Sequence, residues 1–280
     1  MKTRILTTVL VLTAALALTS CKHHINDYYD DLAPLSPANV KVLALDYEVE
    51  ISWDRSPDSD VAGYNVYSSY EFDGHYTLIG NTKNTYFIDG GNNGPDNGVK
   101  YFYAVTAYDY EGNESDLSDT YVYGIPRPEG HNVTLFDFNV DKTKGGFDFS
   151  EYRIVNYDDQ NNDLFFEKYD GKYYLNVWDD SDIKDMGPTR DITEITLAPV
   201  SGYVPLIPGD NIKYTEVLER HTYIIKTWNN HFAKVRITQI AADRIIFDWA
   251  YQLLENERML KGSRKESRNK VYSGITVHRQ

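Results

Sequence analysis

The stretch YFYAVTAYDYEGNES, residues 101–115, decides the fold of the first half of this chain. Four of its residues lie two positions apart, so that in a strand their side chains share one face: Tyr101, Tyr103, Val105 and Ala107. A period of two residues is typical of a β-strand with one buried face. The segment 109–115 that follows is rich in Asp, Gly and Asn, and it predicts a turn.

Similar patterns surround this stretch on its N-terminal side. The segment DVAGYNVY, residues 60–67, predicts a turn that leads into a strand, and two earlier runs alternate in the same way: Val40, Val42 and Ala44, then Val49, Ile51 and Trp53. Aromatic residues make up 14% of the chain and include 24 tyrosines. Short alternating runs separated by turn residues, with many aromatics, indicate an all-β sandwich.

These segments together resemble a fibronectin type III domain over residues 36–126. The resemblance implies a seven-stranded sandwich in which Trp53, on the second strand, is the core aromatic residue. It also implies that Tyr101 forms a tyrosine corner, in which the hydroxyl of a buried ring bonds to nearby backbone. Such modules act as spacers or binding units. The loop DGGNNGPDNG, residues 89–98, is longer and richer in Gly and Asn than usual, and we interpret it as a flexible turn that could be an adapted contact loop.

The strand pattern restarts after GIPRPEG, residues 124–130, which reads as a linker. We therefore expect a second β-rich domain over 131–257, either a β-sandwich or an α+β unit. A helical period is visible only over 250–261. The predicted strands are 133–138, 152–157, 164–168, 173–178, 192–197, 222–227, 233–240 and 244–251. A basic tail, 258–280, follows.

The first 21 residues have the layout of a secretory signal peptide: Lys2 and Arg4, an apolar run, and then Leu18-Thr19-Ser20 before Cys21, the only cysteine. This motif resembles the lipobox of bacterial lipoproteins. The resemblance implies that Cys21 is acylated and becomes the new N-terminus, with 22–35 as a tether. A lipid anchor that includes palmitate would hold the protein at the cell envelope. We expect the membrane to be the outer membrane. Whether the protein lies on its periplasmic face or at the cell surface is left open.

The charge of the chain excludes some partners. Residues 22–125 contain 18 acidic and 5 basic side chains, and residues 126–280 contain 24 and 21. Such an acidic chain repels nucleic acid, so we expect no nucleic-acid partner and a protein or glycan partner instead.

The segments at 221–237 and 243–252 are similar to the closing strands of HmuY-like haem-binding lipoproteins. Two histidines ligate iron in that family. Here His221 and His231 flank a predicted hairpin and could face each other. Exposed aromatic rings could instead stack on sugars, and the candidates for such a ligand-binding surface are Trp228, Tyr173 and Tyr174, with Trp178 and Trp249 beside them. Trp249 alternates with Phe247 and Tyr251, which predicts a half-buried ring.

Two acidic runs, 158–163 and 179–182, concentrate the oxygen ligands that calcium prefers, with Asp158, Asp163, Asp179 and Asp182 as candidates. Solvated turns are the alternative, and no other cofactor is expected. A carboxylate pair such as Glu194 and Glu216 could serve a small secreted hydrolase. The sequence favours a non-catalytic envelope lipoprotein that presents or binds a partner, with the type III module as spacer and the second domain as the specific part. A carbohydrate- or haem-binding receptor subunit is the first alternative.

Overall fold

The computed structural model describes residues 32–118 and 122–260. Cys21 and most of the predicted tether and tail lie outside these ranges. The strands are β1 (Ala38–Leu45), β2 (Glu48–Asp54), β3 (Val61–Ser69), β4 (Thr77–Thr82), β5 (Tyr86–Asp89), β6 (Tyr101–Asp109), β7 (Val122–Gly124), β8 (Glu129–Phe136), β9 (Gly146–Asp148), β10 (Arg153–Val155), β11 (Leu164–Tyr169), β12 (Lys172–Trp178), β13 (Asp182–Pro188), β14 (Ile212–Glu216), β15 (His221–Lys226), β16 (Phe232–Ile240) and β17 (Arg244–Gln252). Two short 3-10 turns, η2 (Gly91–Asn93) and η3 (Lys142–Lys144), complete the elements of these described ranges. Over the described ranges, the chain has no helix long and apolar enough to span a membrane.

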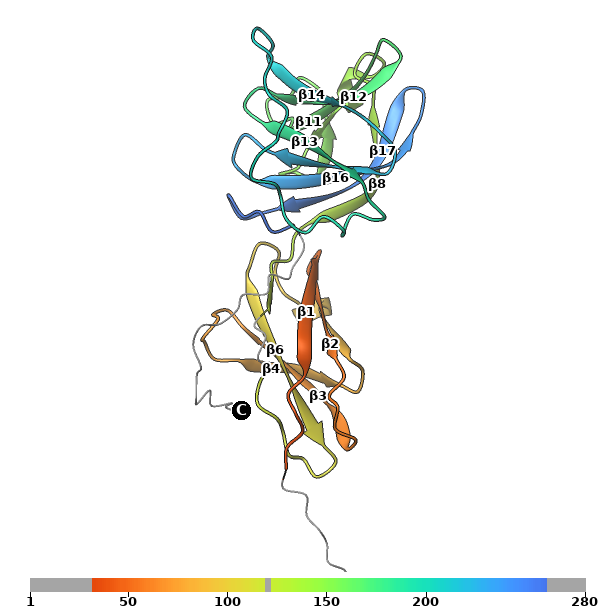
Figure 1. The fold of residues 1–280 in the computed structure, drawn as a ribbon. Coiled ribbons are helices and arrows are strands. Elements are labelled where there is room, and N and C mark those ends of the chain that lie inside the picture. Colours follow the sequence, from red (N-terminus) through yellow and green to blue (C-terminus); the bar gives the residue numbers. More distant parts are fainter. Residues whose placement is uncertain (1–31, 119–121, 261–280) are drawn as a thin grey trace, which may run out of the picture. The chain divides into compact units, whose positions relative to one another are not determined.

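The first seven strands form a sandwich of two antiparallel sheets (Figure 1). One sheet has the order β1-β2-β5 and the other β4-β3-β6-β7. Alternate side chains of both sheets meet in one buried cluster, to which Val42, Ile51, Val66 and Val105 belong. The alternation seen in the sequence therefore builds the core, because successive strand residues point to opposite faces. Seven strands in sheets of three and four confirm the predicted type III fold.

Two aromatic residues of this sandwich behave as the resemblance implies. Trp53 is buried on β2, and its ring packs edge-on against Tyr64 at 5.4 Å between centroids. The Tyr101 ring is also buried, and its hydroxyl accepts a hydrogen bond from the backbone N–H of Asp96 at 3.0 Å. This bond ties the start of β6 to the loop before it, as a tyrosine corner does.

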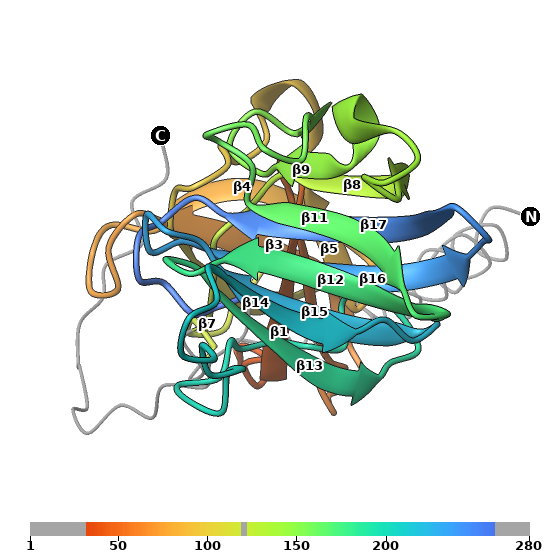
Figure 2. The ribbon, with the colours of Figure 1, turned by 90° about the horizontal axis from the view of Figure 1, so that it is seen from above.

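The remaining strands form a second sandwich from two five-stranded sheets, β10-β9-β11-β12-β14 and β13-β15-β16-β17-β8. Figure 2 shows β11, β12 and β14 in one layer and β17, β16 and β15 in the layer behind it. Both sheets contribute to a single core that includes Phe147, Phe166, Val177, Val235 and Phe247. Of the two architectures left open by the sequence, the structure has the all-β one.

The sequence pattern failed for some strands of this sandwich. No strand is predicted at β9, β13 or β14, and β13 and β14 are the outermost strands of their sheets. An edge strand has one unpaired side and a weaker need for buried residues, so its alternation is faint. The predicted strand 192–197 is wrong. Its apolar residues Ile192 and Ile195 pack from an irregular loop, and only Leu197 forms a bridge, to Met259.

The helical period at 250–261 also misleads. Residues up to Gln252 complete β17, and the Gln252 side chain then closes a turn by donating to the Met259 carbonyl at 2.8 Å and accepting from the Leu254 N–H at 3.1 Å. Met259 and Leu260 are buried, so the segment predicted as a basic tail from residue 258 begins inside the packed structure. The last residue of the predicted tether is likewise bonded to the first sandwich. The Leu35 N–H donates to the Asp58 carboxylate, and the Leu35 carbonyl accepts from the Ser56 hydroxyl.

Candidate functional site

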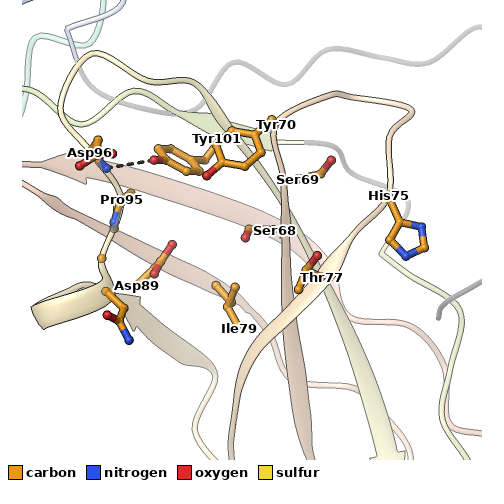
Figure 3. A pocket seen from close by; sticks show the side chains of 12 residues that line it. Ser68, Ser69, Tyr70, His75, Thr77, Ile79, Asp89, Pro95, Asp96 and Tyr101 are labelled. Atoms are coloured by element: carbon orange, nitrogen blue, oxygen red, sulfur yellow. Dashed lines mark hydrogen bonds between the residues drawn. The ribbon is translucent and has the colours of Figure 1, made fainter. Parts of the chain in front are cut away.

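A polar pocket opens on the first sandwich, and it has a volume of about 340 Å³ (Figure 3). Its walls come from the end of β3, from β4, from the end of β5 and from the loop that leads to β6. The lining residues are Ser68, Ser69, Tyr70, His75, Thr77, Ile79, Asp89, Asn93, Gly94, Pro95, Asp96 and Tyr101. A volume of this size is at the lower end of the range for small-molecule sites.

Two tyrosines form one side of the pocket. The rings of Tyr70 and Tyr101 lie side by side, with 5.2 Å between centroids and an angle of 44° between planes (Figure 3). Tyr101 is 8% exposed and is held by Asp96, whereas Tyr70 is 71% exposed. Burial raises the pKa of the Tyr101 hydroxyl, which therefore stays protonated. The buried ring thus supports an exposed one, whose free surface can meet a ligand.

Carboxylates stand on another side. Asp89 ends β5, and its Oδ2 accepts a hydrogen bond from the Tyr103 hydroxyl at 2.9 Å. Burial raises the pKa of Asp89, and the Tyr103 bond partly opposes that rise. Asp96 is exposed at the rim. The pocket therefore presents two carboxylates as hydrogen-bond acceptors. Asp89 is held by the Tyr103 hydroxyl, and Asp96 lies on the loop before β6.

The loop that contributes Asp96 is held at several points. Gly94 donates to the Gly91 carbonyl at 3.2 Å, and the Asn97 side chain bonds to Tyr47 N–H at 2.9 Å and to Asp46 at 2.6 Å. Gly91 has a φ of 78°, a conformation that favours glycine. The composition of this stretch predicts a flexible turn, but these bonds fix its path. Its unusual length and composition were the sequence signal for a contact loop, and its residues line the pocket.

The lining has no lysine or arginine among the described residues. It combines serine and threonine hydroxyls, two carboxylates and an exposed tyrosine ring. Hydroxyls and carboxylates suit a ligand with many O–H groups, and the π face of tyrosine suits the C–H face of such a ligand. The two carboxylates repel an anionic ligand, and His75 is the one basic side chain among the described lining residues.

The predicted histidine pair is not brought together. Thr222 pairs with Arg236 and Lys226 with Phe232, so His221 lies at the open end of the hairpin and His231 beside its turn. Six residue steps along the strand, from 221 to 227, separate the two ends by roughly 20 Å. His221 Nδ1 bonds to Asp185 at 2.9 Å, and His231 Nδ1 bonds to the Gln252 carbonyl at 3.0 Å. The hypothesis that the two rings face each other is therefore wrong.

The predicted aromatic residues divide between surfaces. Trp228 is 55% exposed at the turn between β15 and β16. Tyr173 and Tyr174 are neighbours on β12, so they point to opposite faces of their sheet. Tyr173 packs against the core and stacks on Phe166, whereas Tyr174 lies on the outer face against Tyr214. These three residues do not form one site, and their role in binding stays a prediction.

The acidic candidates for calcium differ in exposure and in their partners. Asp158 is exposed, Asp163 is 5% exposed and accepts from the Phe149 N–H at 2.9 Å, and Asp182 pairs with Lys213 at 2.8 Å. Asp179 is exposed. No group of three or more metal-binding side chains is present in the described ranges. The calcium site that the sequence suggests at these residues therefore stays a prediction.

The two glutamates of the hydrolase hypothesis are each held by a basic residue. Glu194 accepts from the Arg190 N–H at 2.8 Å, and Glu216 accepts from Lys172 at 3.0 Å. The Arg190 contacts lower the pKa of Glu194, which is the opposite of what a general acid needs. Nothing in this arrangement favours paired acid–base chemistry.

Comparison with known proteins gives partial matches, and no family model matches the chain. Over 100 residues, 35% of its length, the chain is 39% identical to an amylopullulanase of Thermoanaerobacterium saccharolyticum, and over 95 residues it is 39% identical to one of Thermoanaerobacterium thermosulfurigenes. It spans only 7% and 5% of those two proteins.

Among solved structures, an Fn3-like protein from Clostridium thermocellum is 28% identical, with 35% of this chain and 100% of that chain covered and a TM-score of 0.29. A β-1,2-glucanase from Parabacteroides distasonis is 25% identical, with 35% and 14% covered and a TM-score of 0.30. On its own strand order and tyrosine corner, the chain contains a fibronectin type III-like domain.

Proposed function

We propose that this protein is a non-catalytic, lipid-anchored envelope protein that binds a neutral glycan through the pocket of its type III domain. The observation that carries the proposal is the exposed Tyr70 ring beside hydroxyls and carboxylates, without a lysine or arginine among the described lining residues. A sugar offers a C–H face for the ring and hydroxyls for the acceptors. The proposal thus assigns binding to the type III domain, which the sequence favours as a spacer.

The curated relatives support the same class of ligand. Amylopullulanases are named for pullulan, a polymer of glucose, and the shared segment is a small part of each enzyme. A segment of about 100 residues is too short for most catalytic folds that act on glycans, and it suits an accessory module. We therefore propose that the protein binds a glycan without hydrolysing it, and we choose glucose oligomers as the first probes.

Replacing Tyr70 with alanine tests the pocket directly. We expect Tyr70→Ala to raise the Kd for maltotriose about tenfold, because the exposed ring provides most of the apolar contact. Isothermal titration on the full chain without its signal peptide measures the change. Because Tyr70 is 71% exposed, its removal leaves the folded structure intact.

Tyr110→Ala is the matched control, since Tyr110 is 76% exposed on the same sandwich and does not line the pocket. It should bind as the unmodified chain does. If the unmodified chain binds no maltotriose, or if both variants bind equally well, the pocket is not a glucan site and the spacer role returns.

The anchor has its own test. Cys21→Ala removes the thiol that the lipobox resemblance assigns to acylation, so we expect labelled palmitate to enter the unmodified protein and not the variant. Both proteins should be exported, because the apolar run of the signal peptide is unchanged. Label found in the variant would mean that the lipid is attached elsewhere.

A further inference from the structure

The second sandwich has an aromatic strip on the outer face of the sheet formed by β11, β12 and β14. In the register of these strands, Phe165 pairs with Asn176 and Asn176 with Tyr214, so the three side chains share one row. Tyr174 and Trp178 lie two positions to either side of Asn176 and point to the same face. The inner face holds Leu175 and Val177 and belongs to the core.

Ring contacts connect these residues. Phe165 lies 5.0 Å from Trp178, and Tyr174 lies 5.7 Å from Tyr214, both measured between centroids. Phe138 and Tyr157 stack on each other at 4.5 Å and extend the strip from Phe165, at 5.9 and 6.1 Å. A row of rings on a sheet face usually faces a second layer, because exposed aromatic surface is costly in water. Here Tyr214 is 39% exposed, and Tyr174 and Trp178 are half-buried.

Two carboxylates and a buried amide accompany the rings. Glu167 and Glu216 flank Tyr174 in the next row. Asn176 is fully buried in the middle of the strip, and its Oδ1 has no hydrogen-bond partner. An unpaired buried amide oxygen costs free energy unless a donor reaches it. The acceptors that a ligand can reach are therefore the two glutamates, since Asn176 is fully buried, and Lys172 at the edge of the strip is paired with Glu216.

We propose that this face, with Tyr174, Trp178 and Tyr214 as its contact rings, binds a chain of neutral sugar residues as a second glycan site. The class of ligand rests on the proposed function of the type III pocket, but the residues and the domain are different. Flat rings fit the C–H faces of successive sugars, and Glu167 and Glu216 accept from their hydroxyls.

The charges on this face argue against a second copy of the chain as its occupant. A face-to-face dimer would bury Glu167, which has no basic partner among the described residues, and burial of an unpaired carboxylate is unfavourable. A glycan hydroxyl, in contrast, can donate to either carboxylate.

A long polymer tests the strip because a short sugar can occupy the pocket alone. In native gels containing pullulan or amylopectin, the unmodified chain should be retarded. Tyr214→Ala should reduce its apparent affinity about tenfold and leave maltotriose titration unchanged. Tyr214→Phe keeps the ring and should restore the retardation. Trp228→Ala, which removes an exposed ring from the hairpin of the other sheet, should behave as the unmodified chain does.

The two proposals fail in different ways. Equal retardation of Tyr214→Ala and the unmodified chain overturns the strip and leaves the pocket untouched. If retardation is lost in Tyr70→Ala but kept in Tyr214→Ala, the strip is overturned and the pocket stands. If retardation is lost in Tyr214→Ala but kept in Tyr70→Ala, and the unmodified chain binds no maltotriose, the pocket alone is overturned. No retardation of the unmodified chain, or a dimer in sedimentation that Tyr214→Ala dissociates, overturns the glycan role of the strip.

Discussion

Asp163→Asn should make the protein more stable at pH 8, by up to about 4 kcal/mol, and should have a much smaller effect at pH 5. Burial raises the pKa of the Asp163 carboxyl to about 7; the Phe149 N–H opposes this, and the nearby Asp148 and Asp180 add to it. The carboxyl of an unfolded chain titrates at about 4.

The sign follows from the protons bound by each state. Between about pH 4 and pH 7 the folded state keeps the Asp163 proton while the unfolded state has lost it. Raising the pH through this window therefore favours unfolding, and above pH 7 the full cost is present. Asparagine carries no charge at any pH, and its amide oxygen can accept from the Phe149 N–H as Asp163 does at 2.9 Å.

Thermal unfolding of both proteins at pH 5, 6, 7 and 8 measures the effect. The difference between their midpoints should grow with pH and reach roughly 10 °C. Asp158→Asn is the matched control, because Asp158 belongs to the same acidic run and is exposed. Its midpoint should follow that of the unmodified chain at every pH. A constant difference between Asp163→Asn and the unmodified chain would show that Asp163 is ionised in the folded state throughout.

The acidic run at 158–163 illustrates how far sequence reasoning reaches. Its composition correctly predicts a turn, but it gives no reason to separate Asp158 from Asp163. The separation comes from Asn162, whose side chain accepts from the Phe147 and Leu164 N–H groups at 3.0 and 3.2 Å. These bonds join the turn to β9, a strand of three residues that is too short to show a period.

The same limit applies to the candidate sites. Long alternating strands such as β6 and β17 are visible in the sequence because half of their residues must be buried. The pocket depends on Tyr70, Asp89 and Asp96, which meet only when β3, β5 and the loop before β6 are folded. The composition of the loop indicates a contact region. That Tyr70 lies across the pocket from this loop follows only from the pairing of strands that are distant in the sequence. The aromatic strip likewise depends on the register of β14, which was not predicted.

Tryptophans make this contrast measurable, because Trp249→Ala should be strongly destabilising and Trp228→Ala nearly neutral. Trp249 is 4% exposed, less than the half-buried ring that its alternation predicts. Its ring contacts Phe147 at 5.5 Å, Phe149 at 6.1 Å and Tyr152 at 5.4 Å. Opposite it, Gly130 leaves the space that the ring needs, since a Cβ there would lie 2.2 Å from Trp249 Nε1.

Removing the Trp249 ring opens a cavity between the two sheets, which should cost about 3–5 kcal/mol. Calorimetry of the full chain should then show the transition of the second sandwich lowered by roughly 10 °C. Trp249→Phe retains part of the packing and should lose less. Trp228 is 55% exposed, so its removal should stay within about 0.5 kcal/mol of the unmodified chain. Equal losses for Trp249→Ala and Trp228→Ala would mean that the second core does not depend on Trp249, and the sheet packing described for it would be wrong.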